Sequence, residues 1–172
     1  MGEATPSASS MRKPPFIPVL LSCLLAVAGH AAEAWTSDFP AALRRARSEG
    51  KTVLLDFTGS DWCAGCRRSR TKVLEKPEFL AYAAKHLVLV EVDFPERKPQ
   101  DEALKRQNAE LEKRYKVNGY PAFVLFDADG GVLGRHDSLL EDPAAFLRQL
   151  DTWRKPAPKP TEPAKPADVP GR

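Results

Sequence analysis

The sequence predicts an α/β fold in which helices cover both faces of a central mixed β-sheet. Two short and largely apolar runs, Val53–Phe57 and Leu87–Asp93, are typical of strands buried on both faces. Helical patterns lie between and around these runs, and strands that alternate with helices usually pair in parallel. A third strand, Ala122–Phe126, is followed by a turn and a fourth strand, which adds an antiparallel hairpin to the sheet.

The first helix is expected over Pro40–Arg47. Ser37 and Asp38 are good caps for its N-terminus, and Gly50 is a good stop after its last turn. This helix should precede the first buried strand and pack one apolar face against the sheet.

A second helical stretch is predicted from about Ala64, broken or kinked near Pro77 and ending at about His86. A charged loop with two prolines then leads to a long helix over Asp101–Tyr115. Its apolar residues fall at helical spacing and are expected to face the core: Ala103, Leu104, Leu111 and Tyr115.

The C-terminal part of the domain is predicted to be a hairpin followed by a helix. The segment Asp-Ala-Asp-Gly-Gly at 127–131 is a strong turn signal, and Val132–Arg135 forms the strand after it. The closing helix runs from Asp142 to about Arg154, with a proline in its first turn.

The motif with clear chemical potential is Trp62-Cys63-Ala64-Gly65-Cys66. Two cysteines separated by two residues, at the start of a helix that follows a strand, have the geometry of a redox dithiol. The first sulfur lies near the helix N-terminus, where unpaired N–H groups and the helix dipole favour a negative charge. We therefore expect Cys63 to be the nucleophile and Cys66 to resolve the mixed disulfide that it forms.

Other functions of a Cys-x-x-Cys pair fit the sequence less well. A structural zinc site needs four ligands, and the only other cysteine, Cys23, lies far upstream. Covalent haem attachment requires a histidine after the second cysteine, where this chain has Arg67. An inert structural disulfide stays open as an alternative, although so short a loop constrains little of the unfolded chain. The sequence predicts no metal site and no bound cofactor.

Residues 1–34 are predicted to be a signal peptide, and its start is either the first residue or Met11. Basic residues precede the apolar stretch Val19–Ala28, and Ala32-Glu33-Ala34 supplies the small residues that a signal peptidase recognises. The apolar stretch is short for a transmembrane span. We expect an exported, periplasmic protein; an N-terminal membrane anchor that leaves the domain facing the periplasm is the alternative.

Residues 35–154 are predicted to form one domain, and residues 155–172 a disordered tail rich in proline, lysine and alanine. About 120 residues are enough for one hydrophobic core. The tail lacks apolar periodicity and cannot bury enough surface to offset the entropy lost on ordering. The charges of the domain nearly cancel, and the whole chain carries a formal net charge of +3, so nothing argues for a nucleic-acid partner.

The order of these features resembles the thioredoxin superfamily over most of residues 35–154. The Trp-Cys-x-x-Cys segment after a strand, Gly119-Tyr120-Pro121 before the third strand, and the closing hairpin and helix carry the resemblance. The stretch Asp-Phe-Thr-Gly-Ser-Asp-Trp-Cys at 56–63, together with Glu91-Val92-Asp93, is similar to exported bacterial thioredoxin-like proteins. It is also similar to the C-terminal periplasmic domain of the membrane disulfide reductase DsbD.

The resemblance implies a substrate-binding role for residues around the dithiol. Pro121 would be a cis-proline that faces the dithiol, which places the backbone of Tyr120 beside Cys63. That backbone could then bind an incoming peptide as a short strand. The Tyr120 side chain would influence the choice of partner. Trp62 would shield the disulfide from water and leave some surface for partners.

The resemblance also implies that Asp56 accepts or relays the proton of Cys66. Burial of a carboxyl in an apolar strand should raise its pKa towards that of a useful base; an exposed place at a strand edge is the alternative. The chain departs from standard thioredoxin in two ways. It has an extra residue between the acid and the cysteines, and Glu91 stands near the place of a thioredoxin lysine. Asp61 would oppose a thiolate.

The predicted activity is thiol–disulfide exchange through Cys63 and Cys66. The pair Ala64-Gly65 lacks the histidine of strongly oxidising relatives, so a reductase of disulfides in exported proteins is favoured, with a membrane protein as electron donor. A disulfide oxidase or isomerase is the alternative within the same class. A non-enzymatic metal-binding or partner-binding module is the alternative from another class. We expect a monomer.

Overall fold

The computed structural model describes residues 1, 2 and 35–155 of the 172-residue chain. The predicted signal peptide and the predicted tail therefore lie outside the described part, apart from residues 1, 2 and 155. Within the described part, no helix is both long enough and apolar enough to cross a membrane.

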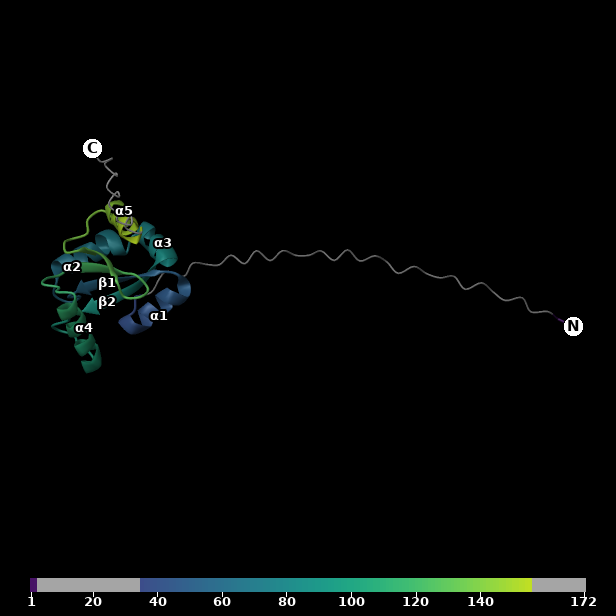
Figure 1. Cartoon of the computed structure of the whole chain (residues 1–172), viewed down its shortest axis with the longest axis horizontal. Coiled ribbons are helices and arrows are strands. Elements are labelled where there is room, and N and C mark those ends of the chain that lie inside the picture. The colour runs from purple at the N-terminus through teal and green to yellow at the C-terminus, as the bar shows by residue number, and fades with distance from the viewer. Residues whose placement is uncertain (3–34, 156–172) are drawn as a thin grey trace, which may run out of the picture.

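The described domain contains five α-helices, one π-helical segment and four strands (Figure 1). Each element predicted from the sequence is present, with bounds that differ by a few residues at most. In chain order, the elements are α1 (Phe39–Glu49), β1 (Thr52–Thr58), α2 (Ala64–Ser69), the π-helix η1 (Arg70–Leu74), α3 (Pro77–His86), β2 (Leu87–Asp93), α4 (Glu102–Arg114), β3 (Ala122–Phe126), β4 (Val132–His136) and α5 (Pro143–Arg154).

The four strands form one mixed sheet in the order β2-β1-β3-β4. β1 pairs in parallel with β2 and antiparallel with β3, and β3 pairs antiparallel with β4. The parallel pair comes from the two buried runs, and the antiparallel hairpin follows the Gly-rich turn. β1 is a central strand, and the dithiol segment follows its C-terminal end.

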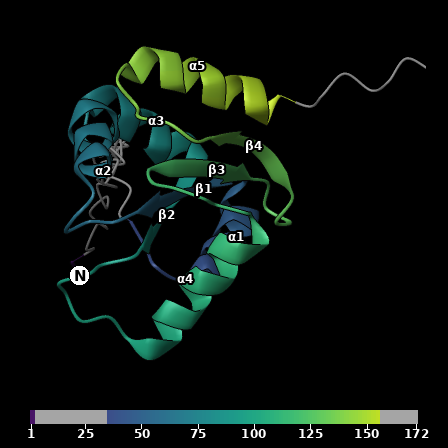
Figure 2. The same cartoon turned by 90° about the vertical axis from the view of Figure 1, so that its left-hand side faces the viewer.

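Helices cover both faces of this sheet. Figure 2 shows α2, α3 and α5 on one side of the strands and α1 and α4 on the other. The predicted fold class, a mixed sheet between helical layers, is confirmed.

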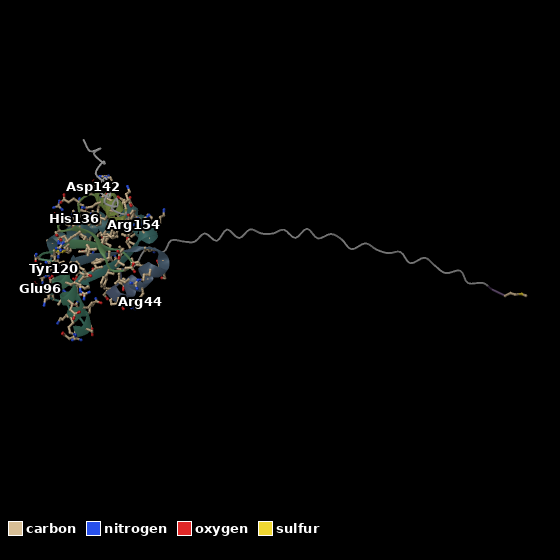
Figure 3. The ribbon with its side chains drawn as sticks, in the orientation of Figure 1. Arg44, Glu96, Tyr120, His136, Asp142 and Arg154 are labelled. Atoms are coloured by element: carbon tan, nitrogen blue, oxygen red, sulfur yellow. A yellow bond between two sulfur atoms is a disulfide. The ribbon has the colours of Figure 1, made fainter. Side chains whose placement is uncertain are left out.

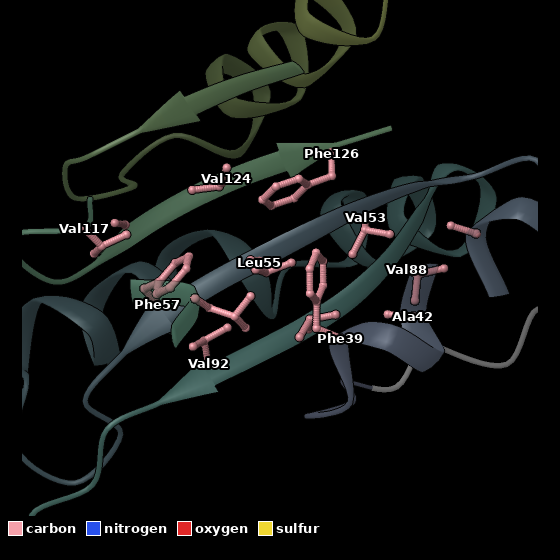
Figure 4. Close-up of a cluster of buried hydrophobic side chains, with 14 residues drawn as sticks. Phe39, Ala42, Val53, Leu55, Phe57, Val88, Val92, Val117, Val124 and Phe126 are labelled. Atoms are coloured by element: carbon pink, nitrogen blue, oxygen red, sulfur yellow. The ribbon is translucent and has the colours of Figure 1, made fainter. Parts of the chain in front are cut away.

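Two clusters of buried side chains hold these layers together. One joins α1, α4 and one face of the sheet, around Phe39, Leu55 and Phe126 (Figure 4). The other joins η1, α3, α5 and the opposite face, around Phe79 and Phe123. Each large apolar side chain that is fully buried stabilises the fold by roughly 1.5–3 kcal/mol. The strands below the dithiol are therefore anchored on both faces.

The ends of α1 follow the predicted capping pattern. The Asp38 carboxylate accepts a hydrogen bond from the backbone N–H of Ala41 at 2.8 Å. Gly50 closes the helix with φ of 65°, a left-handed conformation that glycine adopts without steric cost.

The predicted break near Pro77 has two parts. α2 passes into the π-helix η1, and a turn at Glu75 and Lys76 follows. Pro77 then stands at the start of α3, where its missing N–H costs no hydrogen bond. The chain thus uses this proline to begin a helix after the interruption.

The predicted apolar face of α4 is correct for Leu111, which is buried, and wrong for Ala103, which is exposed. A polar residue, Asn108, takes a buried position on this helix. Its side-chain amide donates a hydrogen bond to the backbone oxygen of Asp93 at 2.8 Å, which satisfies the buried group. Periodicity alone could not identify Asn108 because its partner lies on β2.

Candidate active site

The two cysteines of the motif are joined by a disulfide at the start of α2. Their Cα atoms are 5.3 Å apart. Cys63 is the N-cap of α2, and its sulfur accepts a hydrogen bond from the backbone N–H of Cys66 at 3.1 Å. Cys63 exposes 7% of its surface and Cys66 exposes 5%. The sulfur that receives an N–H donor is thus the one expected to carry the thiolate.

Trp62 lies beside the disulfide and is partly exposed, at 37%. Its indole N–H donates to the backbone oxygen of Phe94 at 2.8 Å. A Cβ atom on Gly59 would lie 2.4 Å from the indole, so only glycine permits this ring to lie over the loop. The indole also meets the Tyr120 ring edge-on, with ring centres 5.8 Å apart.

Tyr120 is held between two other side chains. Its ring stacks on Phe94, with centres 5.1 Å apart, and its hydroxyl donates a hydrogen bond to the Glu112 carboxylate of α4. Burial and then this hydrogen bond raise the pKa of Tyr120, so the hydroxyl stays protonated. In the view of Figure 3, Tyr120 and Glu96 lie at the same end of the domain. The sequence analysis did not find Phe94 or Glu112, because no local pattern marks either.

The peptide bond between Tyr120 and Pro121 is cis. Pro121 lies against the first turn of α2. A Cβ atom added to Gly65 would lie 3.5 Å from the Cδ atom of Pro121, and it would lie 2.9 Å from a methyl carbon of Leu139. A cavity of about 590 Å³ opens here, lined among others by Gly65, Tyr120, Pro121, Arg135 and Leu139. We call it the proline-side cavity.

Leu139 belongs to the loop between β4 and α5 and is 38% exposed. The neighbouring Leu140 is buried, and its backbone N–H donates to the hydroxyl of Ser69 at 3.0 Å. An ion pair of 2.7 Å between Arg68 and Glu141 further ties this loop to α2. Leu139 is therefore held over the dithiol segment by two links, and the sequence analysis did not identify it.

Asp56 lies in β1 with only 3% of its surface exposed, and its Oδ1 atom has no hydrogen-bond partner. Burial raises the pKa of this carboxyl to about 7; Arg70 opposes this shift, and Glu91 and Asp93 add to it. Because β1 is a central strand, the alternative of an exposed strand edge is wrong. The carboxyl therefore changes its charge near neutral pH.

A second cavity, of about 470 Å³, reaches Cys66 and is lined mainly by polar and charged residues. We call it the charged-side cavity. Arg70 and Glu91 form an ion pair in its wall, and the Arg70 guanidinium lies 5.7 Å from the centre of the Trp35 ring. The complete lining is Thr58, Ser60, Cys66, Arg67, Arg70, Thr71, Glu91, Asp93 and Lys98.

Asp61 binds the loop that follows β2. Its carboxylate accepts backbone N–H groups of Glu96, Arg97 and Lys98 at 3.1, 2.8 and 3.0 Å. Desolvation acts to raise the pKa of Asp61, but the three N–H donors together lower it below its usual range. The carboxylate expected to oppose a thiolate on Cys63 thus serves to hold this loop. Within the described residues, His, Cys, Asp and Glu form no group of three or more suited to a metal.

A disulfide at the first turn of a helix, on a mixed sheet and next to a cis X-Pro bond, defines a domain of the thioredoxin class. The family model of the thioredoxin-like domain matches residues 39–153, and the chain belongs to this family.

Relatives and solved structures agree with this assignment. The disulfide bond reductase DsbH of Chlamydia pneumoniae is 42% identical over 101 residues, which cover 59% of this chain and 60% of DsbH. The thiol:disulfide interchange protein DsbD of Klebsiella pneumoniae is 32% identical over 110 residues, 63% of this chain and 17% of DsbD. A solved DsbH oxidoreductase is 32% identical with a TM-score of 0.67, covering 84% of this chain and 94% of that one. The chain thus matches less than two thirds of the length of either curated relative, and the predicted similarity to DsbD is confirmed.

Proposed function

We propose that this protein is a thiol–disulfide oxidoreductase that reduces disulfides of exported proteins. The single observation that carries the proposal is the Cys63–Cys66 disulfide at the start of α2, beside the cis bond before Pro121. Similarity to a protein named as a disulfide bond reductase supports the direction.

In the proposed reaction, the thiolate of reduced Cys63 attacks a disulfide of the partner protein. One partner sulfur leaves as a thiolate, and a mixed disulfide with Cys63 forms. Cys66 then gives up its proton to Asp56, and its thiolate attacks the Cys63 sulfur. This step releases the second partner sulfur and closes the Cys63–Cys66 disulfide. Two electrons pass to the partner, and a membrane electron donor restores the dithiol.

The proline-side cavity is the proposed binding place for the partner. An extended peptide there could hydrogen-bond the backbone of Tyr120 as an added strand. Trp62, which precedes Cys63 in the chain, and Leu139, which reaches Gly65 between the two cysteines, are exposed apolar side chains, and they would contact residues next to the partner cysteine. Tyr120, fixed by Phe94 and Glu112, would shape this surface.

The remaining parts of the proposal concern the whole chain. Residues 1–34 would direct export to the periplasm, residues 35–154 would form the redox domain, and residues 155–172 would be a tail beyond it. We propose that the protein acts as a monomer and needs no bound cofactor, because electrons arrive and leave through protein thiols.

The purified protein should reduce insulin when supplied with a dithiol reductant. Cys63→Ser should abolish turnover, and Cys66→Ser should trap mixed disulfides that identify partners. Val132→Ser, at an exposed position that lines neither cavity, is the control and should retain activity. A reduction potential near that of thioredoxin, about −270 mV, would support a reductase, whereas one near −120 mV would show an oxidase. Full activity in both Cys63 and Cys66 variants would refute the proposal.

A further inference from the structure

The buried carboxyl of Asp56 poses a problem for repeated turnover. A base that takes the proton of Cys66 must lose that proton before the next cycle. Asp56 lies within the sheet, 3% exposed, and its Oδ1 atom has no hydrogen-bond partner. Its exchange with water therefore depends on the groups between this carboxyl and the surface.

The sheet register brings Glu91 to Asp56. The two residues are direct partners in the parallel pair of β1 and β2, so their side chains lie on the same face of the sheet. Neighbouring strands are about 4.8 Å apart, which places the two carboxyl-bearing residues side by side. Unlike Asp56, Glu91 lines the charged-side cavity and keeps 30% of its side chain exposed.

Arg70 fixes this second carboxyl. It comes from the π-helix η1 above the sheet, and its guanidinium pairs with Glu91 while lying over the Trp35 ring. Because its side chain is only 33% exposed, this pair is less screened by water than the Arg68–Glu141 pair of α2, whose side chains are 56% and 55% exposed. The charged groups that act on Asp56 are Arg70 from η1 and Glu91 and Asp93 from β2, while β3 places the apolar Phe123 opposite it. The other charged or titratable groups that line the charged-side cavity with them are Cys66 and Arg67 from α2 and Lys98 from the loop after β2.

We propose that Arg70 and Glu91 are positioning residues that set the pH range in which Asp56 accepts the proton of Cys66. The inference rests on the proposed function and deepens it. Burial is the largest cause of the raised pKa of Asp56; Arg70 lowers that pKa and Glu91 raises it, so these two charges adjust the pH at which the buried carboxyl titrates.

The step balances in protons and electrons. The Cys66 thiol gives its proton to the Asp56 carboxylate, and its sulfur displaces the partner thiolate from Cys63. The neutral Asp56 then releases the proton to solvent before the next cycle, and the partner thiolate takes a proton from solvent. No further oxidant or reductant is required.

The test uses the purified protein and two readouts. The first is the pH dependence of the resolving step, measured as release of a thiol from a mixed disulfide with Cys63 in a single turnover. The second is the titration of the Asp56 carboxyl by carbon NMR in the oxidised protein, which does not depend on activity. Arg47→Met and Asp129→Asn are matched controls, because this exposed ion pair joins α1 to the turn after β3 and lines neither cavity.

Glu91→Gln removes a negative charge, so the midpoint at which the resolving step speeds up with pH and the midpoint of the Asp56 titration should both move to lower pH by about one unit. Arg70→Met removes a positive charge and should move both midpoints to higher pH. The control variants should leave both midpoints in place. Unchanged midpoints in the Glu91 and Arg70 variants would overturn the inference. If Cys63→Ser kept turnover, the proposed function would fail instead, and the carboxyl titration would still decide whether Arg70 and Glu91 act on Asp56.

Discussion

The two cavities that flank the Cys63–Cys66 disulfide differ in the groups that they present. The proline-side cavity has Pro121, Gly65 and the exposed Leu139 at its dithiol end. The charged-side cavity has an ion pair in its wall, and one member of that pair, Glu91, is the strand partner of the buried Asp56. Under the proposed function, this difference assigns partner contacts to one side of the dithiol and proton transfer to the other.

This separation has a measurable consequence. Substitutions on the proline side should change the kinetics with protein partners by a similar factor at every pH. Substitutions on the charged side should change how activity or stability depends on pH. A substitution on the proline side that changed the pH dependence, or one on the charged side that changed partner kinetics equally at every pH, would contradict this separation of roles.

The largest effect is expected from Asp56→Asn. The pKa of Asp56 is raised from 3.8 to about 7 on folding, so the folded protein binds this proton more tightly than the unfolded chain does. The stabilisation from the proton is complete below about pH 4 and is lost as the pH rises through about 7. Relative to Asp56→Asn, the wild-type free energy of unfolding should fall by roughly 2–4 kcal/mol between pH 4 and pH 8.5.

Urea denaturation at several pH values measures this difference. Asp129→Asn is the control, because the Asp129 side chain is 87% exposed and should not change the slope with pH. Parallel pH curves for wild type and Asp56→Asn would show that burial does not hold the proton on Asp56.

The next effect concerns Leu139. Leu139→Ser should lower kcat/KM for a protein disulfide about fivefold at every pH, because about 1 kcal/mol of apolar contact with the partner is lost. Val132→Ser is the matched control: Val132 is also exposed, at 53%, but does not line the proline-side cavity. An equal loss in both variants, or a loss confined to one pH range, would argue against a specific contact at Leu139.

The sequence predicted the features of this site that depend on local pattern. The apolar run of β1 located the sheet and the dithiol after it, and the polar Asp56 within that run indicated a buried acid. The remaining contacts join distant segments whose approach is fixed only by tertiary packing. Arg70 and Glu91 are 21 residues apart, and Asp61 lies 35 residues before the first amide that it binds. From the sequence alone, a basic residue in a helix such as Arg70 and an acid in a loop such as Asp61 both resemble ordinary solvent-exposed side chains.

The superfamily resemblance contributed what local pattern could not, namely the importance of the segment before Pro121. It did not identify the residues that this chain uses around that segment. Leu139 reaches the dithiol because Leu140 is bound to Ser69, a contact between a loop and a helix 71 residues apart. Glu112 acts from α4 on Tyr120, and only the packing of that helix brings the two side chains together.

A smaller effect is expected from Gly65→Ala. The new Cβ would lie 2.9 Å from a Leu139 methyl carbon, and this flexible side chain can move away. The gain in helix propensity, about 1 kcal/mol, should offset the strain, so stability should stay nearly constant. We expect kcat/KM to fall about twofold because Leu139 is displaced. In a Leu139→Ala background, Gly65→Ala should not lower kcat/KM further, because the side chain that it displaces is already gone. If the losses of the two substitutions added in the double variant, this explanation would be contradicted.

The smallest effect on catalysis is expected from Asp61→Ala, which acts on a loop. Three backbone N–H groups of the loop after β2 would lose their shared acceptor, and the loop should open more often. Trypsin should then cut after Arg97 several times faster, while Pro99 protects the bond after Lys98. Asp129→Ala is the control and should leave this cleavage unchanged. Trp62 donates a hydrogen bond to the backbone of Phe94 in the same loop, so opening of the loop should also disturb Trp62. If trypsin cleaved faster but kcat/KM for a protein disulfide did not change, the loop would not help to position Trp62.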